Sequence, residues 1–213
     1  AGSWRGTSSP DCPVRTIYLA THFKNYYEAA PIEDVMHYIE DLGLWGYNTI
    51  IIHYPTWQYV DLEDAEAQRW LERFKTILSG AKNCGLDVGL IQCPNQGYKS
   101  SPLEWRGTRV PGHRRGNHGV NLCPSKPEAK ELLLNLYRDL FDEFKYIGLD
   151  YLISWPYDEG GCACDECWPW GARGFLDMSK EMEKLFTVRF PKSKFVLSTW
   201  CFENEDDSNT DDE

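Results

Sequence analysis

Short apolar runs rich in β-branched residues alternate with amphipathic helical patterns along this chain, and the alternation constrains its fold more than any other feature. The runs typical of strands are residues 16–20, 48–53, 86–92, 151–155 and 195–200. Between them, apolar residues recur about every 3.6 positions, as in helices with one buried face, within residues 31–42, 67–81, 125–144 and 175–190. Strands separated by helices pair in parallel through right-handed crossovers. The sequence therefore predicts an α/β fold with a parallel sheet.

The residues that follow each predicted strand distinguish two kinds of parallel sheet. A nucleotide-binding doubly wound sheet carries a glycine-rich phosphate turn after its first strand, and this sequence has none. A (β/α)8 barrel instead places polar and aromatic residues at the strand ends, where they form one rim. Such residues here are His22, His53, Asn95, Asp158, Glu159 and Trp200. A barrel needs eight strands and about 250 residues, so we predict a TIM-type barrel truncated after its fifth strand.

Net charge is concentrated at the C-terminal end of the 213-residue chain. The formal net charge is −11, from 33 acidic and 22 basic residues. Residues 203–213 contain seven of the acidic residues and no basic one, which leaves a net charge of only −4 on the rest. A polar, acidic run of this kind is typical of a disordered tail. We expect an N-terminal extension at residues 1–14, the partial barrel at 15–202 and the acidic tail at 203–213.

The composition also restricts the partners. Nucleic acid is recognised by basic grooves, which a mildly acidic body does not offer. No apolar run approaches the roughly 18 residues that cross a membrane. We therefore expect neither nucleic acid nor a membrane as a partner. The eight cysteines are more than a cytosolic enzyme usually carries but fewer than a disulfide scaffold needs, so they favour no compartment, and nothing indicates an oligomeric state.

An adjacent pair of carboxylates, Asp158 and Glu159, follows the strand predicted at residues 151–155. Like charges and partial burial raise the pKa of one carboxyl group of such a pair. Neighbouring Trp155 and Tyr157 favour that shift for Glu159, and a proton donor that works near neutral pH requires it. Capping a helix or lying solvated in a loop is the alternative role for the pair. We predict that Asp158 and Glu159 are catalytic.

Other residues near the strand ends are predicted to bind the substrate. Histidine and asparagine side chains can hydrogen-bond polar groups of a ligand, and aromatic rings can stack on its flat faces, although both kinds of residue are common in cores. The predicted substrate-binding residues are His22, His53, Asn95, Trp155, Tyr157 and Trp200.

Four segments of the chain resemble the family 20 β-hexosaminidases and the related α-glucuronidase-type barrels. They are residues 18–23, 44–49 and 123–128 and the Asp158–Glu159 pair, and the similarity extends over residues 15–202. In those hexosaminidases the Glu protonates the glycosidic oxygen, and the Asp orients the acetamido group of the substrate, which acts as the nucleophile. The resemblance implies that Glu159 is the general acid/base, that Asp158 orients the substrate, and that no cofactor is required.

Three closely spaced cysteines, Cys162, Cys164 and Cys167, follow the carboxylate pair. Thiolates at short spacing suit a tetrahedral zinc site, for which the fourth ligand would be Cys201 or a histidine. A disulfide with one spare thiol and three free thiols are the alternatives. A metal here would fix the loop that carries Glu159.

A loop of about thirty residues, from Cys93 to Cys123, is far longer than the usual 4 to 6 residues and is expected to be functional or mobile. It concentrates the basic residues Arg106, Arg109, His113, Arg114, Arg115 and His118. These are either solvated or recognise a sugar acid. After the loop, Ser125 and Glu128 fit a capping box and predict where the next helix begins.

Taken together, the residues and the resemblance predict a glycoside hydrolase that cleaves O-glycosidic bonds of a hexosamine or related sugar. One alternative is a glycan-binding barrel fragment without activity. Another is a metal-dependent hydrolase built on the cysteine cluster. A rate assay beside a binding assay separates the first two, and zinc analysis tests the third.

Overall fold

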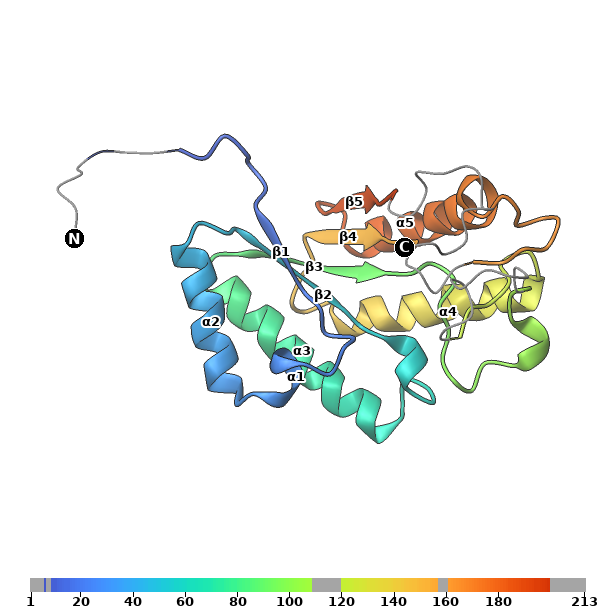
Figure 1. Ribbon diagram of the computed structural model, residues 1–213, viewed down its shortest axis with the longest axis horizontal. Coiled ribbons are helices and arrows are strands. Elements are labelled where there is room, and N and C mark those ends of the chain that lie inside the picture. Colours follow the sequence, from blue (N-terminus) through green and yellow to red (C-terminus); the bar gives the residue numbers. More distant parts are fainter. Residues whose placement is uncertain (1–5, 7–8, 109–119, 157–160, 200–213) are drawn as a thin grey trace, which may run out of the picture.

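The computed structural model describes residues 6, 9–108, 120–156 and 161–199. Strands and helices alternate along them, as predicted (Figure 1). The strands are β1 (Thr16–Leu19), β2 (Thr49–His53), β3 (Asp87–Gln92), β4 (Tyr151–Ser154) and β5 (Lys194–Leu197). The α-helices are α1 (Tyr26–Ala29), α2 (Ile32–Leu44), α3 (Ala65–Asn83), α4 (Pro127–Glu143) and α5 (Leu176–Arg189). Shorter 3-10 turns at Thr56–Gln58 and Leu103–Trp105 and a π turn at Gly171–Phe175 complete the elements.

The five strands form one sheet in the order β1-β2-β3-β4-β5, and each neighbouring pair is parallel. Strands that are consecutive in the sequence are therefore also neighbours in space. A doubly wound sheet reverses its strand order at a switch point, whereas a barrel keeps the sequential order. The topology of the described residues is that of a barrel.

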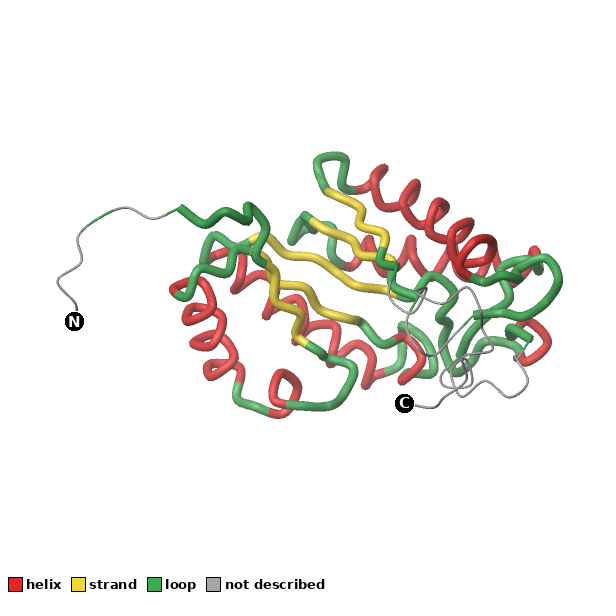
Figure 2. The backbone as a smooth tube through the Cα atoms, turned by 45° about the horizontal axis from the view of Figure 1, so that its top comes forward, coloured by secondary structure: helices red, strands yellow, loops and turns green. Residues whose placement is uncertain are grey.

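One face of the sheet carries all four long helices. Side chains of α2, α3, α4 and α5 form a single core with outward-facing strand residues such as Leu19, Ile52 and Leu90. Figure 2 shows the strands as a twisted row with the helices following its outer side. Because helices cover both faces of a doubly wound sheet, the one-sided arrangement again favours a barrel.

The opposite, inner face is built from the alternate residues of the same strands. In β2, Ile50 and Ile52 belong to the helix-covered core, whereas Ile51 packs with Ile91 and Tyr151 on the inner face. The strand period of two explains why β2 is apolar throughout, since both of its faces are buried.

The predicted capping box before α4 is wrong. The helix has Lys126 as its N-cap and Pro127 in its first turn, and no side chain caps it. Proline is favoured at this position because the missing N–H would have no helical partner. Ser125 is therefore one residue too early to cap, and its Oγ lies 3.0 Å from Cys123 Sγ.

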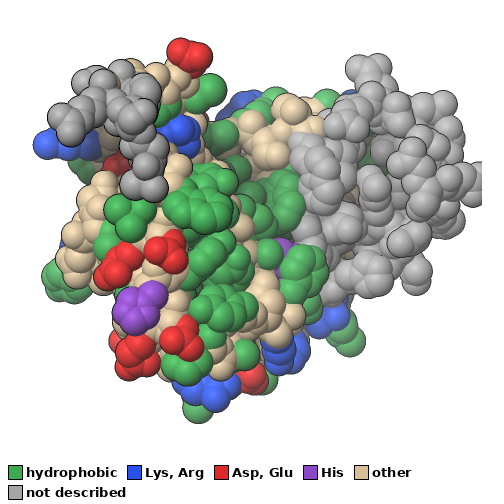
Figure 3. Space-filling view, turned by 60° about the vertical axis from the view of Figure 1, so that its left-hand side comes forward, with side chains coloured by type: hydrophobic (Ala, Val, Ile, Leu, Met, Phe, Trp, Pro, Cys, Tyr) green, Lys and Arg blue, Asp and Glu red, His purple; other side chains and the backbone are tan. Residues whose placement is uncertain are grey.

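Charged side chains are spread over the face of the molecule that Figure 3 shows. Figure 3 shows acidic and hydrophobic side chains interleaved, with lysine and arginine at the margins of this view rather than in a continuous patch. The acidic residues Glu33, Asp34, Glu40 and Asp41 are exposed on α2. None of the described helices has the length and apolar character needed to cross a membrane.

Candidate functional site

The carboxyl ends of β1, β2 and β4 bring together four aromatic side chains, which we call the inner-rim cluster: Tyr18, His22, His53 and Trp155. Tyr18 Oη lies 2.7 Å from His22 Nδ1, and the Tyr18 and Trp155 rings meet edge to face at 5.7 Å. The His22 ring centroid is 5.3 Å from that of His53 and 6.3 Å from that of Trp155. Three residues predicted from widely separated segments therefore share one rim, where a barrel builds its site.

His53 is the most buried member of the cluster and is held by the main chain. Its Nδ1 lies 2.7 Å from the carbonyl oxygen of Ile91. A carbonyl only accepts hydrogen bonds, so Nδ1 carries the proton of the neutral ring. Burial lowers the pKa of His53 to about 3. The ring is therefore neutral at physiological pH and acts in the structure as a fixed, uncharged side chain.

An open pocket of about 440 Å³ lies beside the cluster and shares His22 with it. Its other lining residues are Phe23, Lys24, Trp57, Gln58 and Lys99. The volume is within the range of small-molecule sites, about 300–1,000 Å³. Two aromatic rings, two ammonium groups and an amide give it both stacking faces and hydrogen-bond donors.

Lys24 has a φ of 51°, in the left-handed region that side chains other than glycine seldom adopt. Such strained residues collect at functional sites, because the surrounding structure must hold them there. Its ammonium group lies 3.7 Å from Glu66 Oε1, in an exposed ion pair. The residue with this strained backbone therefore lines the pocket.

The other predicted sugar contacts divide into two groups. Asn95 is buried, and its Nδ2 donates to the carbonyl of Leu122 at 3.3 Å, which fixes the loop after β3. Tyr157, Asp158, Glu159 and Trp200 lie outside the described residues. The described segments on either side of the carboxylate pair end at Pro156 and resume at Gly161.

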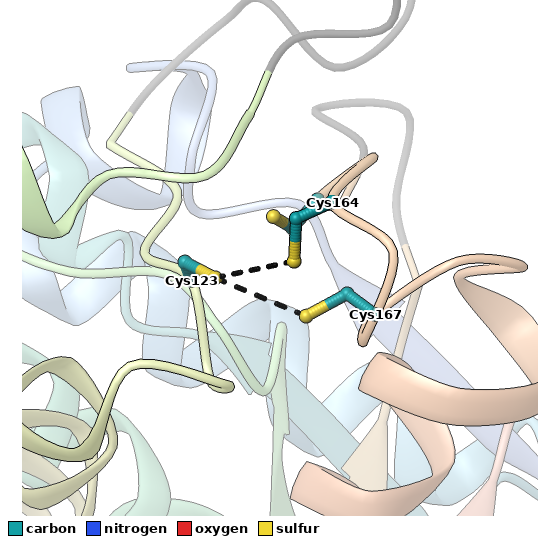
Figure 4. A group of neighbouring side chains, drawn as sticks. Cys123, Cys164 and Cys167 are labelled. Atoms are coloured by element: carbon teal, nitrogen blue, oxygen red, sulfur yellow. Dashed lines mark hydrogen bonds between the residues drawn. The ribbon is translucent and has the colours of Figure 1, made fainter.

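The predicted cysteines gather with one that the sequence did not single out. The Sγ atoms of Cys123, Cys162, Cys164 and Cys167 all lie within 4.8 Å of one another, and we call them the four-cysteine cluster. Cys123 Sγ is 3.7 Å from Cys164 Sγ and 3.9 Å from Cys167 Sγ. Figure 4 shows Cys123 reaching from the segment before α4 toward two sulfurs of the segment after β4. Among the described residues, Cys123 is the fourth member of the group. Cys201, one of the fourth ligands expected from the sequence, lies outside the described residues.

Hydrogen-bonding groups surround the sulfurs of the four-cysteine cluster, and three of its four cysteines are buried. The N–H of Thr108 donates to Cys162 Sγ at 3.2 Å, and Ser125 Oγ lies 3.4 Å from Cys164 Sγ. A hydrogen bond from Cys167, together with the N–H groups of Cys164 and Thr108, lowers the pKa of the Cys162 thiol. Cys123, Cys162 and Cys167 are buried.

Trp170 covers the cluster and requires two glycines to do so. A Cβ on Gly161 would lie 2.0 Å from Trp170, and one on Gly174 would lie 2.3 Å from it. The indole ring is thus held between the segment that enters the cluster and the π turn that leaves it. Trp170 is thus a buried residue that packs against the cysteines.

No protein-family model and no curated protein matches the chain. Solved structures match most of it. The pneumococcal virulence factor StrH, studied for N-glycan recognition and hydrolysis, superposes with a TM-score of 0.58 at 6% identity, over 86% of this chain and 52% of that one. GH5_18 from Streptomyces cattleya in complex with GlcNAc has a TM-score of 0.51 at 13% identity, over 87% and 44%. An α-amylase from Lactobacillus plantarum has a TM-score of 0.51 at 16% identity, over 87% and 45%.

These matches confirm the predicted fold class: the chain has the fold of the glycoside hydrolase barrels. It spans about half or less of the length of each of the three proteins. They belong to several kinds of carbohydrate-active protein, so the likeness does not single out the hexosaminidases of family 20.

Proposed function

We propose that this chain belongs to a glycoside hydrolase in which Glu159 is the general acid/base and Asp158 orients the substrate. The observation that carries the proposal is the inner-rim cluster, which gathers His22, His53 and Trp155 at the carboxyl ends of three parallel strands. Active sites of barrels lie at this rim, and the chain runs from Trp155 into the carboxylate pair only three residues later.

The pocket next to the cluster supports a carbohydrate as the substrate. Phe23 and Trp57 can stack on a sugar ring, while Gln58, Lys24 and Lys99 can donate to its hydroxyl groups. Solved structures of similar fold include GH5_18 in complex with GlcNAc, which agrees with a hexosamine as the sugar. The proposed substrate is thus an O-glycoside of a hexosamine or a related sugar.

Replacement of the proposed acid tests the mechanism. In the full-length protein, Glu159→Gln should lower kcat about 100-fold or more on an unactivated oligosaccharide, whose leaving group needs a proton. The loss should be much smaller on a dinitrophenyl glycoside, whose leaving group departs without protonation. Both rates are measured by product release, and glycan affinity by calorimetry should stay near the wild-type value.

The exposed Glu104→Gln is the matched control and should leave both rates unchanged. An equal loss on the two substrates would contradict an acid role for Glu159. Wild-type protein that binds the glycan without turning over either substrate would instead establish the alternative, a non-catalytic glycan-binding barrel.

The two lysines of the pocket favour a second, narrower candidate, in which the sugar carries a carboxylate. Lys99 and Lys24 would pair with a uronate, as the basic residues of the long loop also suggested from the sequence. Lys99→Gln should raise KM about tenfold for a uronide and leave KM for the neutral glycoside unchanged. Lys130→Gln, on α4, is the control with the same loss of charge, and equal KM changes on both substrates would refute the candidate.

A further inference from the structure

We propose that the four-cysteine cluster is a structural zinc site in which Cys123, Cys162, Cys164 and Cys167 supply all four ligands. The inference is independent of the proposed glycosidase activity, because it concerns a group of side chains apart from the inner-rim cluster. It also replaces the fourth ligand expected from the sequence.

The distances fit a metal rather than a disulfide. Four thiolates about 2.3 Å from a central zinc in a tetrahedron lie roughly 3.8 Å from one another. In the structure, Cys123 Sγ lies 3.7 Å from Cys164 Sγ and 3.9 Å from Cys167 Sγ, close to that value. A disulfide needs about 2.05 Å between its sulfurs, and none of these four cysteines forms one.

The four thiolate ligands indicate which metal would bind and whether it would be structural or catalytic. Soft thiolates in a tetrahedral arrangement suit zinc or iron, and a fully closed set of four cysteines is typical of structural zinc. A catalytic zinc keeps one position open for water or substrate. Since all four positions are filled by sulfur, the cluster would not activate water, which argues against the metal-dependent hydrolase considered from the sequence.

Hydrogen bonds to the sulfurs form a second layer around the site. The N–H of Thr108 points at Cys162 Sγ, and the hydroxyl of Ser125 lies near both Cys123 Sγ and Cys164 Sγ. Such partners orient metal ligands and offset their negative charge. The segments are also joined by Ala163 N–H, which donates to the carbonyl of Thr108 at 2.9 Å.

The zinc would connect the loops that follow two neighbouring strands. Cys123 ends the long segment after β3, whereas Cys162, Cys164 and Cys167 belong to the segment after β4. Both loops leave the sheet at its carboxyl edge, the edge where the inner-rim cluster lies. The metal would thus act as a cross-link between adjacent parts of the rim.

Metal analysis and X-ray absorption of the purified protein test the site without any substrate. We expect about one zinc per chain and a first shell of four sulfurs at about 2.3 Å. Cys123→Ser should lose most of the zinc or show one sulfur replaced by a lighter atom. The exposed Cys84→Ser is the matched control and should keep both the zinc and the four-sulfur shell.

Several results would overturn the proposal. They are wild-type protein without zinc after growth with added zinc, iron in place of zinc, a first shell of nitrogen or oxygen, or an intact mass that indicates a disulfide among these cysteines. A Cys123→Ser protein that retains four sulfurs would remove Cys123 from the site. If Cys123→Ser does not fold, the wild-type absorption spectrum alone decides between these results.

Discussion

At the scale of single residues, His53 shows how burial turns a titratable group into a fixed one. The ring is fully enclosed, donates from Nδ1 to the Ile91 carbonyl and has a pKa near 3. In the unfolded chain the same side chain has a pKa of about 6.5. Between these values the unfolded state binds a proton that the folded state does not, so the free energy of unfolding falls as the pH decreases from 6.5 toward 3.

We expect this histidine to dominate acid sensitivity in that window. Each pH unit below 6.5 costs about 1.4 kcal/mol of stability, so wild-type protein should lose roughly 2 kcal/mol more than His53→Asn between pH 7 and pH 5. Asparagine keeps a side-chain N–H for Ile91 but does not titrate. Urea unfolding at the two pH values measures the difference, and the exposed His37→Asn should behave as wild type.

At the scale of elements, β3 depends on one glycine that allows its neighbours to approach. Gly89 lies on the inner face between Ile51 of β2 and Tyr151 of β4, which pair with it in register. A Cβ at this position would lie 2.5 Å from the Tyr151 carbonyl oxygen and 2.7 Å from Ile51 Cδ1. Glycine inside a strand often marks such a close approach.

Gly89→Ala should therefore lower the free energy of unfolding by about 1–3 kcal/mol, as overpacking of a core does. Gly43→Ala on α2 is the matched control, since its nearest contact would be an ordinary 3.7 Å to Leu86. Alanine in this last turn of α2 should leave stability unchanged or raise it by up to about 1 kcal/mol. Chemical unfolding compares the two, and an unchanged Gly89→Ala protein would contradict the packing described for β3.

Local pattern was sufficient to predict the elements but not their ends. The buried run before His53 and the stripe that includes Leu71 and Phe74 identified β2 and α3, because burial on a sheet or helix imposes a fixed period. The start of α4 was misread because Ser125 resembles a cap, whereas its hydroxyl lies beside the cysteine sulfurs. The short α1 has too few residues to show a period.

At the scale of the whole molecule, one part of the candidate site can be predicted from the local sequence. The other part depends on contacts between segments that are distant in the sequence. The shared rim of His22, His53 and Trp155 could be predicted because each lies at or just after the carboxyl end of a strand, and parallel strands end at one rim. Cys123 could not be assigned to the other cysteines, since it precedes Cys164 by 41 residues and the spacing carries no motif. One clue was present: Cys123 is the residue that closes the long loop after β3.

If the four-cysteine cluster holds zinc, a chelator should loosen one end of the molecule and leave the sheet intact. Hydrogen exchange should increase within residues 120–126 and 161–175 and stay near its original rate in β1, β2 and β3, whose hydrogen bonds do not involve the cluster. Circular dichroism should change little. Uniform faster exchange across all strands would show instead that the metal supports the whole fold.

The sharing of one group of sulfurs between two loops has a consequence for redesign. A loop of a barrel rim can usually be shortened, lengthened or transplanted by itself, because each one leaves from its own strand. Here the segment ending at Cys123 and the segment holding Cys162, Cys164 and Cys167 complete each other. A loop graft intended to alter specificity at this part of the rim must therefore transfer both segments together.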